Sequence, residues 1–87
     1  MTKIQIYTTK SCGYCVRVRQ LLKGEGIPFE EIDITGTPEM RDVLMAKTGE
    51  RTVPQIFVDG IYIGQDDELY ELVRSGALKH RDRHVSG

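Results

Sequence analysis

One stretch decides the fold of this chain: residues 3–23, which read KIQIYTTKSCGYCVRVRQLLK. Its first part alternates Ile4 and Ile6 with polar residues, and this period of two predicts a strand over residues 3–8. Over residues 13–23 the apolar residues recur at helical spacing, and glycines follow, so we expect a helix that ends there. The stretch is therefore a strand, a loop and a helix in direct succession.

Two cysteines are all that the chain contains, and both lie at the start of this helix. A helix N-terminus favours a thiolate, so Cys12 is the candidate nucleophile. Cys15, one turn further along, is the candidate resolving thiol because it can attack a mixed disulfide formed on Cys12. The same spacing also forms half of many zinc sites, and buried cysteines often serve only as small core residues. The spacing alone leaves these alternatives open.

Composition limits the classes of function. The chain has 87 residues, 39% of them hydrophobic, and a formal net charge of −1, which suits one soluble domain and gives no broad electrostatic case for nucleic acid or an anionic membrane. No run approaches the roughly 20 apolar residues of a membrane span, and the first residues lack the apolar region of a secretion signal. We therefore expect a cytoplasmic protein, in which neighbouring cysteines are more often catalytic or metal-binding than structural.

The rest of the chain predicts further strands and helices. We expect a strand over residues 28–34, a helix over 38–48 with Thr37 as its N-cap, and a last helix that starts at Asp66 and stops at Gly76.

A hairpin is predicted between the last two helices. Two apolar runs, residues 55–58 and 61–63, flank Asp59-Gly60, a dipeptide suited to a two-residue turn. The resulting order, β-α-β-α-β-β-α, predicts an α/β protein with one four-stranded mixed sheet and three flanking helices.

The C-terminal residues look different from the rest. We expect a domain over residues 1–78 and a polar tail over 79–87, which has no apolar period. His80 and His84 are spaced like paired metal ligands but lie too far from the cysteines for a finger-type zinc site.

Two loops and one helix start bear on the thiols. Lys10 lies two residues before Cys12. Its charge either favours a thiolate on Cys12 or attracts an anionic substrate, and the alternative is an ordinary solvated lysine. Pro54 precedes a strand, either as a cis proline that presents the backbone of Val53 beside Cys12 or as a trans proline of an edge strand. The N–H groups that open the last helix either bind a carboxylate or are simply capped.

Taken together, these residues resemble the glutaredoxins of the thioredoxin superfamily. The likeness covers about residues 2–78, and the matches occur in the family's order and approximate spacing. They are Lys10, Cys12-Gly13-Tyr14-Cys15, Arg51-Thr52-Val53-Pro54, the hairpin, and Ile63-Gly64 before the last helix. The resemblance implies a thioredoxin fold and a dithiol thiol-disulfide oxidoreductase.

The resemblance also implies a glutathione site around the nucleophile. Pro54 would be cis, Val53 would pair through its backbone with the cysteinyl part of the tripeptide, and Thr52 belongs to the same segment. Tyr14, between the two cysteines, either stacks on the substrate or shields Cys12, or is a partly exposed loop aromatic without a role.

Charged groups would hold the two ends of the tripeptide. By the same resemblance, Lys10, Arg51 and Arg41 would face the glycine carboxylate. The N–H groups of Asp66 and Asp67 would receive the γ-glutamyl carboxylate, and the side chain of Asp67 would meet the γ-glutamyl ammonium.

The implied activity is the reduction of glutathione mixed disulfides and protein disulfides. Cys12 would take the glutathione from a glutathionylated protein, and a second glutathione would regenerate it; Cys15 would resolve mixed disulfides with proteins. Glutathione is then a co-substrate, NADPH and glutathione reductase are the electron source, and the monomeric protein needs no tightly bound cofactor.

The sequence departs from the family pattern at Gly13, where the commonest active site has proline, and before the last helix. Gly13-Tyr14 resembles members that hold a [2Fe-2S] cluster between two subunits through the nucleophilic cysteine, here Cys12, and glutathione. Gln65 and Asp66 fill positions where the family usually has glycine and then cysteine or serine. The alternatives are an iron–sulfur carrier that works as a dimer and an electron donor charged by thioredoxin reductase.

Overall fold

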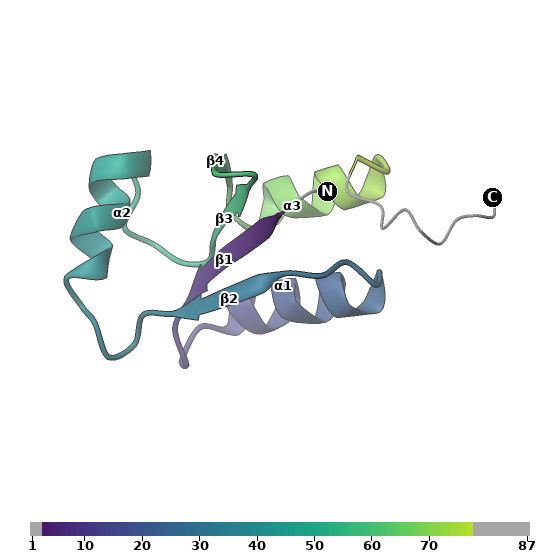
Figure 1. The fold of residues 1–87 in the computed structure, drawn as a ribbon. Helices are drawn as coiled ribbons and strands as arrows, with labels where there is room; N and C mark the ends of the chain where they lie inside the picture. Colours follow the sequence, from purple (N-terminus) through teal and green to yellow (C-terminus); the bar gives the residue numbers. More distant parts are fainter. Residues whose placement is uncertain (1–2, 78–87) are drawn as a thin grey trace.

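The computed structural model describes residues 3–77. The elements follow the predicted order (Figure 1): β1 (Ile4–Thr8), α1 (Gly13–Gly24), β2 (Glu30–Asp33), α2 (Met40–Thr48), β3 (Gln55–Val58), β4 (Ile61–Gly64) and α3 (Asp66–Arg74). The expected tail, with His80 and His84, lies outside the described residues. None of the helices within residues 3–77 is long and apolar enough to cross a membrane.

The four strands form one mixed sheet in the order β2-β1-β3-β4. Strand β1 runs parallel to β2 and antiparallel to β3, while β3 and β4 form the antiparallel hairpin. The sheet predicted from the element order is confirmed. Because β1 and β2 are parallel, the residues that follow them, including the cysteine loop, emerge at the same end of the sheet.

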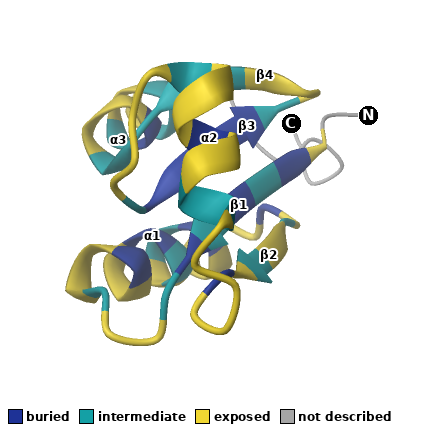
Figure 2. Ribbon diagram, turned by 90° about the vertical axis from the view of Figure 1, so that its left-hand side faces the viewer, coloured by how far each residue is buried: buried dark blue, intermediate teal, exposed yellow. Residues whose placement is uncertain are grey.

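Two apolar clusters cover the two faces of the sheet. The alternation in β1 sends Ile4 and Ile6 into a cluster with Leu22 of α1 and Leu69 of α3. On the other face, Leu44 of α2 packs with residues that include Phe57 and Tyr7. Figure 2 shows the buried residues of β1 and β3 between the helices and the largely exposed outer surface of α2. Helix α1 is thus packed against the sheet, which fixes the position of its N-terminus.

Two predicted elements have other boundaries in the structure. Strand β2 covers only Glu30–Asp33, rather than residues 28–34. Helix α2 begins at Met40, with Glu39 as its N-cap and no side-chain capping bond, so Thr37 is not the cap. The N–H of Met40 bonds to the carbonyl of Thr37, three residues back, so the chain forms a tighter 3₁₀-type turn before the α-helix starts.

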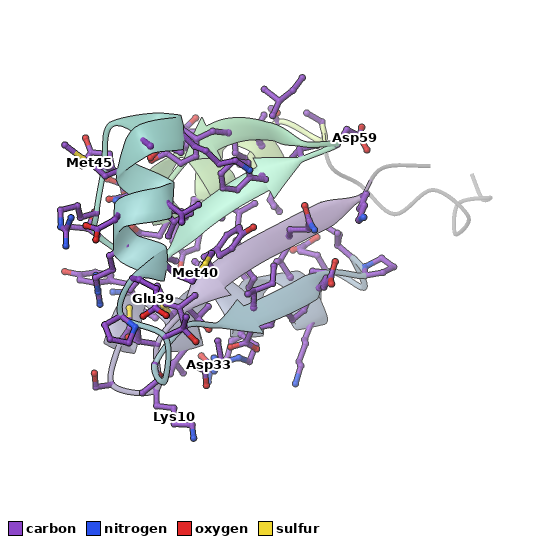
Figure 3. All side chains as sticks on the ribbon, turned by 60° about the vertical axis from the view of Figure 1, so that its left-hand side comes forward. Lys10, Asp33, Glu39, Met40, Met45 and Asp59 are labelled. Atoms are coloured by element: carbon purple, nitrogen blue, oxygen red, sulfur yellow. The ribbon has the colours of Figure 1, made fainter. Side chains whose placement is uncertain are left out.

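The predicted hairpin turn is confirmed. Asp59 and Gly60 have φ angles of 53° and 83°, as a two-residue turn with two positive φ angles requires. The Asp59 carboxylate accepts a hydrogen bond from the Lys3 N–H at 2.8 Å, which ties the turn to the start of β1. In Figure 3, Asp59 lies at the opposite end of the molecule from Lys10, so the hairpin turn is remote from the cysteine loop.

Candidate functional site

Cys12 is the N-cap of α1. Its backbone is extended, with φ −91° and ψ 112°, and its Sγ accepts a hydrogen bond from the backbone N–H of Cys15 at 3.2 Å. The residue is half-buried. A sulfur in this position receives a backbone donor and the positive end of the helix dipole, and both favour negative charge on it. This placement is the one that a nucleophilic cysteine would need, and the role of Cys12 stays a prediction.

Cys15 lies in a different environment. It is fully buried, and both thiols are free. Burial is the main reason why the pKa of Cys15 rises to about 12, and the hydrogen bond and charge of Cys12 raise it further, against smaller opposing effects of the Thr9 backbone and Arg19. Cys15 is therefore a protonated thiol at neutral pH, which suits a group that reacts second.

The raised pKa of Cys15 makes stability depend on pH. A free thiol has a pKa of about 8.5 in an unfolded chain, so the contribution of Cys15 is complete below that pH and is lost as pH rises toward about 12. Between about pH 8 and pH 10 we expect the free energy of unfolding to fall by about 2 kcal/mol more in the wild type than in Cys15→Ala. Urea unfolding of both proteins at the two pH values measures this difference, and parallel pH dependences would contradict it.

The segment before β3 brings a backbone carbonyl to the nucleophile. The Val53–Pro54 peptide bond is cis, which decides between the two alternatives left by the sequence. The Cys12 thiol donates to the Val53 carbonyl, with 3.6 Å between Sγ and O. The structure thus brings together Cys12 and Val53, which lie 41 residues apart in sequence.

The arginines of the predicted site contact the segment that carries Val53. An Arg41 guanidinium nitrogen donates to the Arg51 carbonyl at 2.7 Å, and the Arg51 side chain forms an exposed ion pair with Asp42 of α2 at 2.5 Å. The Arg41 guanidinium therefore lies beside the Arg51 backbone, the Arg51 guanidinium lies beside Asp42, and each already uses part of its donor capacity in these contacts.

Lys10 belongs to the cysteine loop and is exposed. Its backbone N–H donates to the Thr35 hydroxyl at 2.9 Å, and that hydroxyl donates to Asp33 at 2.6 Å. Hydrogen bonds from Thr35 are the main cause of the lowered pKa of Asp33, and the positive charge of Lys10 makes a smaller contribution in the same direction. Figure 3 shows Lys10 and Asp33 at the same end of the molecule. The loop that leads to Cys12 is thus anchored to the segment after β2.

The start of α3 joins the same region through Gln65. The Gln65 side-chain amide donates to the Thr52 hydroxyl, and the Gln65 backbone N–H donates to the Glu68 carboxylate at 2.9 Å. Gly64 leaves room for Glu68, because a Cβ at this position would lie 2.6 Å from the Glu68 Cγ. Asp66, half-buried, and Asp67, exposed, complete the first turn. One N–H of this helix start is therefore already capped.

Tyr14, the remaining predicted site residue, is exposed in the first turn of α1. Among residues 3–77, no group of three or more histidine, cysteine or acidic side chains is arranged to hold a metal ion. The cysteine pair thus lacks further zinc ligands within this range.

Sequence reasoning missed Gln55, the first residue of β3. It is fully buried, and its side-chain amide donates to the carbonyls of Glu50 and Thr52 at 2.7 and 2.9 Å. The available signal was one polar residue at the head of an otherwise apolar strand, directly after Pro54. A buried amide requires hydrogen-bond partners, so this pattern pointed to a structural role in the neighbouring loop.

Comparisons with known proteins give one consistent result. A family model described as Glutaredoxin matches residues 4–63. A glutaredoxin of Pseudomonas aeruginosa is 45% identical over 78 residues, which cover 90% of this chain and 93% of the relative. Glutaredoxin 3 of Escherichia coli is 41% identical over 78 residues, which cover 90% of this chain and 94% of the relative.

Solved structures agree with the sequence matches. A buckwheat glutaredoxin–glutathione complex is similar to this structure with a TM-score of 0.78 and 31% identity, covering 88% of this chain and 73% of that one. The solution structure of a glutaredoxin from Brucella melitensis gives a TM-score of 0.76 and 41% identity, covering 90% and 85%. The predicted thioredoxin fold is confirmed.

Proposed function

Because this chain belongs to the glutaredoxin family of thiol oxidoreductases, we propose that it reduces glutathione mixed disulfides and protein disulfides with electrons from glutathione. One observation carries the proposal: the Cys12 sulfur lies at the α1 N-terminus, 3.6 Å from the Val53 carbonyl oxygen, while Cys15 is buried behind it. One thiol is thus accessible to a disulfide, and a backbone that can dock a peptide lies beside it.

The first reaction needs only Cys12. Its thiolate attacks the glutathione sulfur of a protein–glutathione disulfide, so that a Cys12–glutathione disulfide forms and the protein sulfur leaves as a thiolate and takes up a proton. The thiolate of a second glutathione then attacks the glutathione sulfur bound to Cys12. Oxidised glutathione leaves, and the Cys12 thiolate is restored. The Cys15 N–H, which donates to the Cys12 sulfur in the free protein, would stabilise the thiolate that attacks in the first step and leaves in the second.

The second reaction uses Cys15. When Cys12 forms a mixed disulfide with a protein, its thiol no longer bonds to Cys15 or places a charge beside it, and both of these effects raise the pKa of Cys15. The pKa of Cys15 therefore falls on formation of the mixed disulfide, with burial as the main remaining cause of its elevation. The Cys15 thiolate then attacks the Cys12 sulfur, the substrate leaves as a thiol, and glutathione reduces the resulting disulfide.

Glutathione binding is proposed to use the residues around this sulfur. One solved relative is a glutaredoxin–glutathione complex, and the Val53 backbone 3.6 Å from the Cys12 sulfur supports glutathione binding at this position here. Val53 would pair with the cysteinyl part of glutathione, Lys10 and Arg51 would attract its glycine carboxylate, and the first turn of α3 would meet the γ-glutamyl group. Thr52, Tyr14 and Arg41 would border this site.

Charge removal tests the carboxylate contacts. We expect Lys10→Gln and Arg51→Gln each to raise the KM for a glutathione mixed disulfide by about fivefold at low salt, because one ion pair near a surface contributes about 1 kcal/mol. The difference from the wild type should shrink in high salt. Arg74→Gln is the matched control, since Arg74 is an exposed arginine paired with Glu71 in the last turn of α3. If all three variants behave alike, the charges do not act at the site.

The electron donor is tested by coupling the protein to two reductases. We expect NADPH oxidation with glutathione and glutathione reductase, and at most slow turnover with thioredoxin reductase. The reverse preference would support the thioredoxin-reductase-linked alternative.

A [2Fe-2S] carrier is the second candidate, because the site offers one partly accessible cysteine ligand. Cys12 is half-buried, and the space beside Gly13 is open, with nothing within 4 Å of a Cβ placed there. A cluster would bind Cys12 of each of two copies, and two glutathione thiolates would complete its ligands. Anaerobic purification should then give a coloured dimer that loses its colour in Cys12→Ser; a colourless monomer would exclude this function.

A further inference from the structure

Residues 50–53, here called the Val53 loop, are held in an unusual way. Among the backbone–backbone hydrogen bonds of turns and loops in the described chain, none involves these four residues. Glu50, Arg51 and Thr52 are exposed and Val53 is half-buried, so side chains that bond to the carbonyls of this loop restrict its conformation where the rest of the protein does not cover it. These side chains act together with the hydrogen bond from the Cys12 thiol to the Val53 carbonyl.

Three successive carbonyls of the Val53 loop accept such side-chain bonds. Gln55 donates to the carbonyls of Glu50 and Thr52 at 2.7 and 2.9 Å, and Arg41 donates to the carbonyl between them, that of Arg51, at 2.7 Å. The loop is thus fixed immediately before Val53.

Gln55 is the central group of this arrangement. It is fully buried, and both hydrogens of its amide are used on the loop. The Thr48 hydroxyl at the end of α2 lies 3.1 Å from the Gln55 Oε1 and accepts the Glu50 N–H at 3.1 Å. No buried side-chain nitrogen or oxygen in residues 3–77 is left without a partner. The amide therefore has one defined orientation, because its nitrogen faces the loop and its oxygen faces α2.

We infer that Gln55 is a positioning residue for substrate binding: its amide holds the Val53 loop so that the Val53 backbone lies beside the Cys12 sulfur. Gln55 does not touch the reacting atoms and acts through the loop. The identity of the substrate rests on the proposed function, whereas the positioning of Val53 does not. Loss of the amide leaves two loop carbonyls without donors and frees the segment before Val53 to move.

The test replaces the amide with an apolar group of similar length. Gln55→Met should raise the KM for a glutathione mixed disulfide by about tenfold, since two hydrogen bonds of about 1 kcal/mol each are lost and part of that energy appears in binding. The rate of Cys12 alkylation by iodoacetamide should stay within about twofold of the wild type, because a small reagent does not dock on Val53. A residue that only stabilises the fold would lower the unfolding midpoint and leave KM unchanged.

Two further variants complete the experiment. Thr48→Val removes the hydroxyl beside the Gln55 oxygen with little change in shape, and should raise KM by about threefold even if Gln55→Met does not fold. Gln5→Met is the matched control, because Gln5 also donates a side-chain bond, to Glu30, but lies on β1. Unchanged KM in the Gln55 and Thr48 variants, or a parallel loss of alkylation, would overturn the inference.

A failure of the proposed function gives a different result. In that case the wild type itself would not turn over the glutathione mixed disulfide. The same variants are then compared on a protein disulfide with dithiothreitol as reductant, and an unchanged KM in that assay would also overturn the role of Gln55.

Discussion

Cys12→Ser is expected to lower the turnover of glutathione mixed disulfides by about 10³-fold or more, because a serine hydroxyl is not ionised at neutral pH and cannot form a disulfide. The structure offers no second accessible thiol in its place, since Cys15 is fully buried. A glutathione-coupled assay with purified Cys12→Ser measures the loss.

Cys15→Ser is the matched control for this loss. It should retain the turnover of glutathione mixed disulfides, because the donor that bonds to the Cys12 sulfur is the backbone N–H of residue 15 and does not depend on the side chain. Reduction of protein disulfides should fall strongly in the same variant, since the resolving thiol is absent. Equal activity of the wild type and both variants would contradict the mechanism.

Local patterns in the sequence predicted most of the fold. The alternation of Ile4 and Ile6 gave β1, and Asp59-Gly60 gave the hairpin, because each depends on a few neighbouring residues. The start of α2 could not be read in the same way. Thr37 and Pro38 fit both an α-helical N-terminus and the 3₁₀-type turn that the chain adopts, and the two differ only in which carbonyl each N–H reaches.

The site was predictable where it depends on motifs and not where it depends on which side chain binds which backbone carbonyl. The unequal environments of Cys12 and Cys15 follow from their positions at a helix start. The hydrogen bond from the Arg41 guanidinium to the Arg51 carbonyl could not be predicted from any sequence pattern, because α2 and the Val53 loop meet only in the folded chain. The partners of Gln55 lie nearby in sequence, but its role was hidden because a polar residue at the start of an apolar strand does not show which carbonyls its amide binds.

The two thiols should differ greatly in their reaction with iodoacetamide. With a pKa of about 12, Cys15 in the folded protein is almost entirely protonated at neutral and mildly alkaline pH, and only the thiolate reacts. At about pH 8 its thiolate fraction is about 10³-fold below that of a free cysteine, whose pKa is about 8.5. Burial of the sulfur slows the reaction further.

We therefore expect one equivalent of iodoacetamide to label Cys12 alone in the folded, reduced protein. Labelling of Cys15 should appear only when urea unfolds the chain, and should then reach the rate of an ordinary thiol.

Peptide mapping by mass spectrometry before and after unfolding measures both sites, and Cys12→Ser isolates the reaction of Cys15. In that variant the Cys12 thiol and its charge no longer raise the pKa of Cys15, but burial, the main cause of the elevation, is unchanged. Labelling of Cys15 should therefore remain slow. Rapid labelling of Cys15 in the folded variant would mean that the second thiol is accessible and that the division of roles between the two cysteines is wrong.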